Sequence, residues 1–145
     1  MKKLLLPAIG CLFLLQACTP AGIRKDRAAL QRLDSLASHL AAATDARQNR
    51  EQAETFIAEA EHYYERHPGD SLAVNHLFRA GEVYRGLGEY GKAIETFGRL
   101  WRENPTHPKA PVALFLQAFT FDTHLQDSTL ARRYYQTFLE KYPEH

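Results

Sequence analysis

Residues 77–105 read LFRAGEVYRGLGEYGKAIETFGRLWRENP, and this stretch decides the fold. Its apolar residues recur three and four positions apart on both sides of Gly88-Glu89, which is the spacing of two amphipathic helices. Asn104-Pro105 ends the second helix, because proline cannot continue it. The stretch therefore predicts an antiparallel helical hairpin. The residues expected on its inner faces are Leu77, Phe78, Ala80, Gly81, Val83, Tyr84, Ala93, Ile94, Phe97, Leu100 and Trp101.

The same hairpin occurs a second time in the chain. Moving residues 77–105 forward by 38 positions places apolar residues on apolar residues and proline on proline. A helical hairpin duplicated at such a period is typical of a solenoid. The matching pairs are Leu77 with Phe115, Ala80 with Ala118, Leu87 with Leu125, Ala93 with Ala131, Phe97 with Tyr135, Leu100 with Phe138, and Pro105 with Pro143.

The first copy resembles a tetratricopeptide repeat. Nine residues fall in the spacing of that family's pattern: Leu77, Ala80, Gly81, Tyr84, Gly88, Tyr90, Ala93, Phe97 and Pro105. The second copy is looser, with Phe119, Asp122 and Ser128 in place of Gly81, Tyr84 and Tyr90. The long links resemble those of small tetratricopeptide-repeat lipoproteins of Bacteroidetes-type envelopes and, more distantly, of the lipoprotein subunit of the β-barrel assembly machinery. The resemblance implies a scaffold that binds other proteins.

Helical periodicity extends to the residues before the repeats. It predicts a first hairpin over residues 24–68, which is either an N-terminal cap or a degenerate repeat, followed by the two repeats over 69–145. Asn49 to Gln52 resembles a capping box, Asp70 or Ser71 can cap the third helix, and Pro108 suits the first turn of the fifth. The predicted fold class is all-α: three antiparallel hairpins stacked as a short, right-handed solenoid of the tetratricopeptide type. The polar face of the last helix either caps the array itself or leaves Tyr134 to a partner.

The first residues predict export and lipid attachment. Two lysines precede an apolar run over residues 4–15, which is the order of a secretory signal and is too short to span a membrane. Leu15, Gln16 and Ala17 before Cys18 resemble the bacterial lipobox, which implies cleavage after residue 17 and acylation of Cys18. Cys11 is a competing acceptor that would leave too short an apolar region. Residues 18–23 are then the lipidated cysteine and a short tether. We expect an outer-membrane lipoprotein that faces the periplasm, and the resemblance places Thr19 among the residues that direct this sorting.

The composition of the mature chain excludes several classes of function. Cleavage before Cys18 removes 17 of the 145 residues, among them Lys2 and Lys3. The mature chain then has 16 basic and 17 acidic side chains. Nucleic-acid binders carry a strongly basic face, so no nucleic-acid partner is expected. The chain has no glycine-rich phosphate loop, no nucleophile elbow and no metal-ligand spacing among its seven histidines. We therefore predict that the protein is not an enzyme and needs no cofactor or metal.

What remains is recognition of another molecule. In the tetratricopeptide family the leading helix of each hairpin lines a groove for peptides. The groove positions carry over to Asn75, Arg79, Glu82, Arg85, Gln117, Thr120 and His124. Either Arg79 or Arg85 could bind a carboxylate, or both could pair with Glu82 on a solvated face. The expected function is a membrane-anchored protein-interaction scaffold in envelope assembly or maintenance. The alternative is a module for cell-wall glycan or a nutrient, in which Tyr84 or Tyr90 stacks on sugars.

Overall fold

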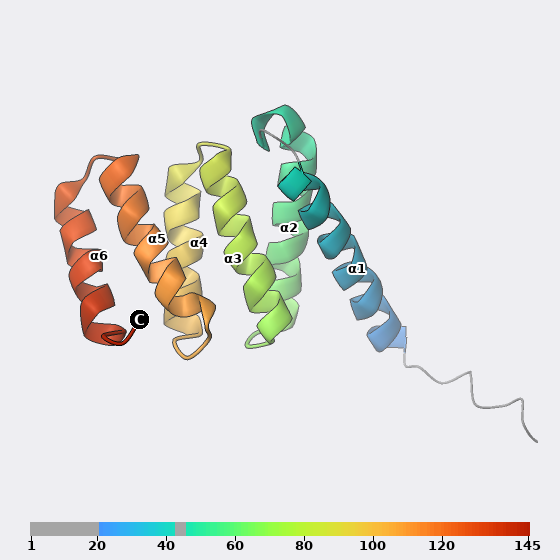
Figure 1. Cartoon of the computed structure of the whole chain (residues 1–145). Coiled ribbons are helices and arrows are strands. Elements are labelled where there is room, and N and C mark those ends of the chain that lie inside the picture. Colours follow the sequence, from blue (N-terminus) through green and yellow to red (C-terminus); the bar gives the residue numbers. More distant parts are fainter. Residues whose placement is uncertain (1–20, 43–45) are drawn as a thin grey trace, which may run out of the picture.

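The computed structural model describes residues 21–42 and 46–145, and this part of the chain is all-α. Six α-helices lie side by side in chain order as three hairpins (Figure 1), which confirms the predicted fold class. Their bounds are α1 (Ala21–Ala42), α2 (Arg50–Arg66), α3 (Ser71–Gly86), α4 (Tyr90–Glu103), α5 (Lys109–Thr123) and α6 (Ser128–Lys141), with a 3-10 turn at Ala46–Asn49 before α2.

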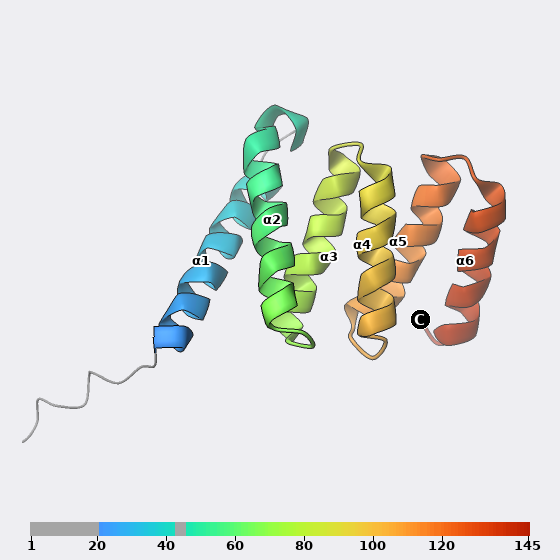
Figure 2. The ribbon, with the colours of Figure 1, turned by 180° about the vertical axis from the view of Figure 1, so that it is seen from behind.

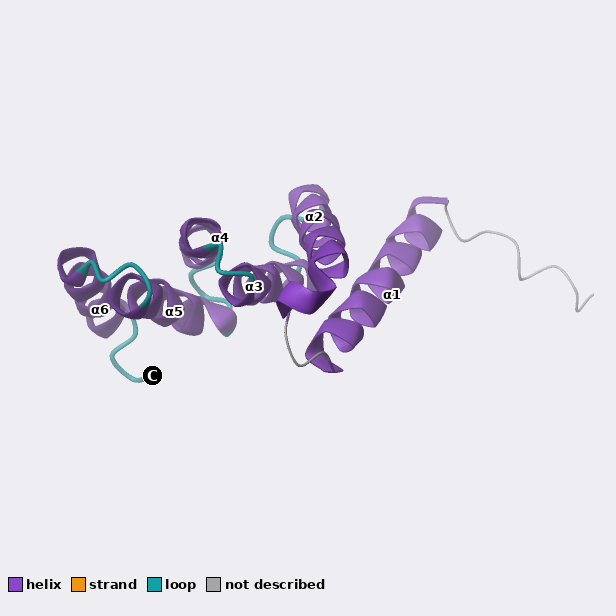
Figure 3. Cartoon of the chain, turned by 90° about the horizontal axis from the view of Figure 1, so that it is seen from above, coloured by secondary structure: helices purple, strands orange, loops and turns teal. Residues whose placement is uncertain are grey.

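The leading helices α3 and α5 lie on one side of the array, and the trailing helices α2 and α4 lie on the other. The view from behind places α2 and α4 in front of α3 and α5 (Figure 2), and the view from above shows the two groups as separate layers (Figure 3). A continuous core runs between the layers from Leu33 of α1 to Leu114 of α5. A smaller cluster of Ile94, Phe121 and Ala131 joins the last hairpin to α4. Among the described helices, none is long and apolar enough to cross a membrane.

Side-chain caps begin two of the helices, one of them at the predicted Asp70. The carboxylate of Asp70 accepts hydrogen bonds from the backbone N–H groups of Leu72 and Ala73, at 2.7 and 3.2 Å, and so begins α3. Asp127 accepts from Leu130 N–H at 2.9 Å and begins α6 in the same way. The predicted capping box before α2 is wrong, because the side chain of Asn49 makes no capping hydrogen bond.

The two repeats are related by 37 residues in their leading helices and by 38 in their trailing helices. At the shorter distance every buried residue of α3 except Phe78 falls on a buried residue of α5, whereas at 38 residues fewer than half of them do. The matched pairs are Ala73 with Ala110, Leu77 with Leu114, Ala80 with Gln117, Gly81 with Ala118, Val83 with Thr120, and Tyr84 with Phe121. The predicted pairing of Leu77 with Phe115 and of Ala80 with Ala118 is therefore wrong by one position.

The turn of the second repeat holds the extra residue. Three residues join α3 to α4, whereas four residues, His124 to Asp127, join α5 to α6. Gly88 in the first turn and Gln126 in the second both take positive φ angles, of 80° and 52°. These two residues are 38 apart, so the trailing helices keep the predicted distance while the leading helices do not.

Close approach of α3 and α4 depends on a glycine. A Cβ atom added at Gly81 would lie 2.6 Å from Cε1 of Phe97, whose side chain has no exposed surface. The Phe97 ring also lies 5.7 Å, centroid to centroid, from that of Phe78. This packing bears out the predicted inner faces of the first repeat.

The N-terminal end of the described chain differs from its prediction. Helix α1 begins at Ala21, so residues 21–23, predicted as part of the tether, are helical. Asp26 forms an ion pair with Arg66 at 3.5 Å and lies 3.3 Å from Nε2 of His67, and these contacts join α1 to the end of α2. Cys18, Thr19 and the predicted signal peptide lie outside the described residues.

Candidate functional site

Helices α1 and α3 and the start of α5 enclose a hollow of about 650 Å³. Three of the predicted groove residues, Asn75, Arg79 and Glu82, line it together. The structure adds Asp34 and Ser38 from α1 and Lys109 from α5, which the sequence prediction did not include. We call this site the polar hollow. It holds charges of both signs within reach of one ligand.

Polar contacts within the hollow connect α1 to α3. Arg79 Nη2 donates a hydrogen bond to the backbone carbonyl of Ala37 at 3.0 Å, so part of its guanidinium is already engaged. His76 Nε2 lies 3.6 Å from a carboxylate oxygen of Asp34. The ammonium group of Lys109 lies 4.7 Å from the ring centroid of Phe78, where it covers the apolar floor of the hollow.

The structure does not bring Gln117 and Thr120 to a groove surface. Gln117 is 2% exposed and lies inside the packing of α4 against α5. Its amide oxygen accepts a hydrogen bond from Trp101 Nε1 at 2.8 Å, and its Nε2 donates to the carbonyl of Ile94 at 3.1 Å. Thr120 is fully buried and donates to the carbonyl of Leu116. Both residues were assigned to the groove through the 38-residue distance, and the one-residue difference in the leading helix turns them inward.

Aromatic side chains occupy the positions of α5 that correspond to Phe78 and Glu82 of α3. At a distance of 37 residues, Phe78 corresponds to Phe115 and Glu82 to Phe119. The Phe115 ring lies 6.3 Å from Phe119, 5.7 Å from Tyr135 and 5.8 Å from Phe138, centroid to centroid. We call these four residues the aromatic shelf. An alignment of α3 with α5 at 37 residues would have predicted the aromatic shelf from the sequence.

The aromatic shelf is open where the equivalent surface of the first repeat is closed. Phe78 is 5% exposed and lies under Lys109 of the following helix, whereas Phe115 is 41% exposed. No described helix follows α6 to cover it. A partly exposed aromatic cluster of this kind marks an interaction surface more often than an isolated apolar residue does.

Arg85 lies where α3 meets the aromatic shelf. The centre of its guanidinium is 5.9 Å from the ring centroid of Phe119, a cation–π contact between the two leading helices. Its Nη1 atom is shielded from solvent and has no hydrogen-bond acceptor among the described residues. His124, the remaining predicted groove residue, is exposed and stacks on the ring of Tyr90, with centroids 4.1 Å apart.

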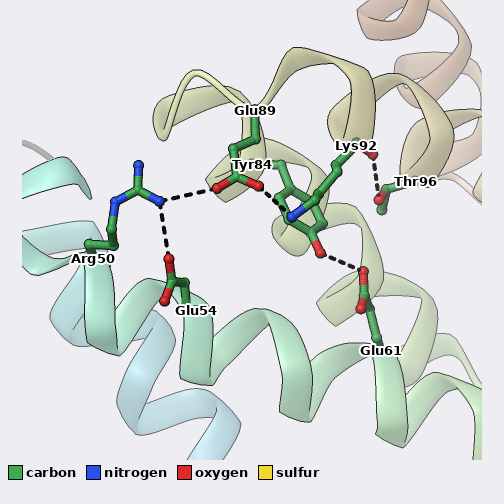
Figure 4. Close-up of polar contacts among 7 residues, drawn as sticks. All are labelled: Arg50, Glu54, Glu61, Tyr84, Glu89, Lys92 and Thr96. Carbon is green, nitrogen blue, oxygen red and sulfur yellow. Dashed lines mark hydrogen bonds and ion pairs between the residues drawn. The ribbon is translucent and has the colours of Figure 1, made fainter.

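A second set of polar residues lies between α2 and the turn that joins α3 to α4 (Figure 4). Glu89 pairs with Arg50 at 3.1 Å and with Lys92 at 2.7 Å, and these two cations hold its pKa below the usual value. Tyr84 donates a hydrogen bond to Glu61 at 3.1 Å, and burial raises the pKa of its phenol. Because most of these charges are exposed, the ion pairs contribute little stability and serve mainly to orient the first hairpin.

Both tyrosines that the glycan hypothesis offers as alternatives for stacking on sugars have partners within the chain. Tyr84 is buried and hydrogen-bonded, and the ring of Tyr90 is covered by His124. Within the described ranges, no group of three His, Cys, Asp or Glu side chains is placed to hold a metal ion.

Stability is expected to depend on pH through two histidines: His76, which is buried in α3, and His107, which is partly buried just before α5. His107 Nδ1 accepts a hydrogen bond from Lys109 N–H at 3.1 Å, which leaves Nε2 to donate to Ser71 Oγ at 3.0 Å. Burial, together with Lys109, lowers the pKa of His107, and burial lowers that of His76. The unfolded chain then binds more protons than the folded one just below about pH 6.5, the ordinary histidine value, so stability falls as the pH falls through that range.

We expect urea unfolding to show lower stability at about pH 5.5 than at about pH 7.5, a range chosen because most carboxylates stay ionised there. The double variant His76→Gln, His107→Gln should reduce this difference. His39, an exposed histidine of α1, is the matched control, and His39→Gln should leave it unchanged. Equal or greater stability at the lower pH would contradict the assignment.

Comparison with known families agrees with this geometry. Residues 77–107 and 112–145 each match the family model of the tetratricopeptide repeat. No curated protein matches the chain. The two matched stretches lie within the second and third hairpins, and repeats of this kind typically serve as non-catalytic scaffolds that bind proteins and peptides.

Proposed function

We propose, from the premise that residues 77–145 are tetratricopeptide repeats, that this protein is a lipid-anchored scaffold which binds an envelope protein on the face formed by α1, α3 and α5. The match supports protein binding in general. The sequence before Cys18 supports the anchor and the envelope. The surface of the leading helices supports the choice of binding face.

The observation that carries the proposal is the exposure of Phe115. An aromatic ring that is 41% exposed costs free energy in water, at roughly 25 cal/mol for each Å² of apolar surface left uncovered. Its equivalent Phe78 avoids that cost under the next helix. Three further aromatic rings extend the same surface, and the polar hollow adjoins it with charged groups. Apolar and charged groups side by side are typical of a protein-binding surface.

The proposed anchor would hold the start of α1 close to a membrane. We expect the lipid on Cys18 to be followed by only a few residues before α1 begins at Ala21. Three residues of extended chain reach about 10 Å, so the hairpins lie near the bilayer surface. The partner is therefore a protein that is itself in, or at, the outer membrane and accessible from the periplasm.

Photocrosslinking in cells tests the proposal. A photoreactive phenylalanine at position 115 or 119 should give a discrete adduct with one envelope protein, because both positions lie on the aromatic shelf. The same amino acid at Glu95, exposed on the trailing helix α4, is the matched control and should give no such adduct. Phe115→Ala should reduce crosslinking from position 119 by about tenfold, since truncating a central aromatic contact typically costs 1–2 kcal/mol or more.

Two results of these experiments would contradict the proposal. If positions 115 and 119 gave no protein adduct, and the purified full chain instead sedimented with peptidoglycan, the scaffold proposal would fail and glycan binding would replace it. Equal adducts from positions 95 and 115 would overturn the choice of face.

A further inference from the structure

Arg85 differs from Arg79 and Arg99 in how its charge is satisfied. Arg79 donates to a backbone carbonyl and Arg99 pairs with Glu103 at 3.2 Å, whereas Nη1 of Arg85 is shielded from solvent without an acceptor. A guanidinium nitrogen that loses water and gains no acceptor costs free energy. That nitrogen is closed to a partner as well as to water, but the Arg85 side chain as a whole is partly exposed and makes no ion pair with a described residue. A carboxylate brought by a partner can therefore pair with the accessible part of this cation, and such charge-assisted pairs with guanidinium are strong.

The apolar part of the surface begins next to this unsatisfied group. Phe119 lies 5.9 Å from the centre of the guanidinium, and Phe115 lies 6.3 Å beyond Phe119, as ring centroids. Side chains three or four positions apart on a helix have Cβ atoms about 5–6 Å apart. A single helix can therefore place an acidic side chain on Arg85 and an apolar side chain on the shelf.

The first repeat indicates that the occupant is helical. There the surface over Phe78 is covered by the start of α5, a helix of this chain. The shelf repeats the geometry of that surface 37 residues later, so a helix from outside the described chain fits it in the same manner. We therefore expect a helix, and not an extended peptide, on the aromatic shelf.

The neighbouring charges set the direction of the partner helix. Asp122 occupies on α5 the position that Arg85 occupies on α3, and it faces Tyr135, whose pKa is raised by burial and then by this carboxylate. An acidic partner group is thus attracted at the α3 end of the surface and repelled at the α5 end. The polar hollow has acidic and basic groups together, Glu82 and Asp34 with Arg79 and Lys109, so it does not select one charge. Arg85 is a cation that lies beside the aromatic shelf itself.

We infer that the aromatic shelf binds an amphipathic helix of a partner protein that carries an acidic residue three or four positions from a bulky apolar residue. The carboxylate pairs with Arg85, and the apolar side chain covers Phe115 and Phe119. This inference rests on the proposed function and narrows it to one class of partner sequence.

Selection from a displayed library of helical peptides tests the inference. The full chain, held in detergent micelles, should select peptides with Asp or Glu three or four positions from Leu, Ile, Met or Phe. For a selected peptide, Arg85→Met should weaken binding by about tenfold to a hundredfold, because it removes a charge-assisted pair. Arg85→Lys should restore part of the affinity, and Arg85→Glu should select basic residues in place of acidic ones.

Arg132, exposed on α6, is the matched control, and Arg132→Met should leave the affinity unchanged. Thermal unfolding of each variant separates loss of binding from loss of fold. Peptides that need Phe115 but bind wild type and Arg85→Met equally would overturn this inference and leave the scaffold proposal standing. If no peptide were selected and no crosslink formed at position 115, the scaffold proposal itself would fail. A dimer of this chain abolished by Phe115→Ala would also overturn the inference, because a second copy would then be the occupant.

Discussion

Phe97→Ala is expected to lower the free energy of unfolding by about 3–5 kcal/mol, the usual range for emptying a fully buried aromatic site. The Phe97 side chain has no exposed surface and packs between Gly81 and Phe78 in the hairpin that decides the fold. A domain of this size is stable by about 5–15 kcal/mol, so the loss removes a large share of that stability. Urea unfolding followed by circular dichroism measures it directly.

Gly81 lies against the same ring, so a substitution there tests the effect of adding an atom to this packing and not of removing a side chain from it. Alanine favours a helix over glycine by about 1 kcal/mol, but its Cβ at this position would lie 2.6 Å from the Phe97 ring, and overpacking typically costs 1–3 kcal/mol. Gly81→Ala should therefore be destabilising in the wild type and less so beside Phe97→Leu. Gly91→Ala is the control, because a Cβ there meets nothing within 4 Å. Equal stability of the Gly81 and Gly91 variants would show that α3 and α4 do not approach as described.

Cys18→Ser is expected to move the protein from the membrane fraction to the soluble fraction almost completely. Several acyl chains, each worth about 0.8 kcal/mol per buried methylene, hold a lipoprotein far more firmly than any surface contact. Fractionation of cells, with mass spectrometry of the N-terminal peptide to detect the acyl groups, measures both consequences.

Cys11→Ser is the matched control for this experiment. It removes the competing acceptor and should leave both fractionation and acylation unchanged. Membrane attachment that survives Cys18→Ser but is lost with Cys11→Ser would move the anchor to Cys11. Attachment that survives both substitutions would overturn the lipoprotein proposal.

The outcome for each predicted binding residue depends on whether it was placed from the first repeat or by copying that repeat forward. Asn75, Arg79 and Glu82 were placed from the first repeat itself, and they line one hollow. Gln117 and Thr120 were placed by copying that repeat forward, and they are buried. The aromatic shelf was missed for the same reason, because Phe115 was assigned to the inner face in the position of Leu77. The type of each residue indicated what it could bind, but the sequence did not show which face of its helix it occupies.

The sequence by itself determined the helices, their order and most of their ends, because periodicity, caps and prolines act through residues close in the chain. It also placed Gly81 and Phe97 on the inner faces of one hairpin, although the contact between them is seen only in the structure. Only the tertiary structure decided which face of α5 is exposed. One extra residue in the turn before α6 changes the registration of α5 by one position, and one position on a helix is a rotation of about 100°. That rotation buries Gln117 and exposes Phe115, because burial depends on neighbours on other helices and not on the local pattern.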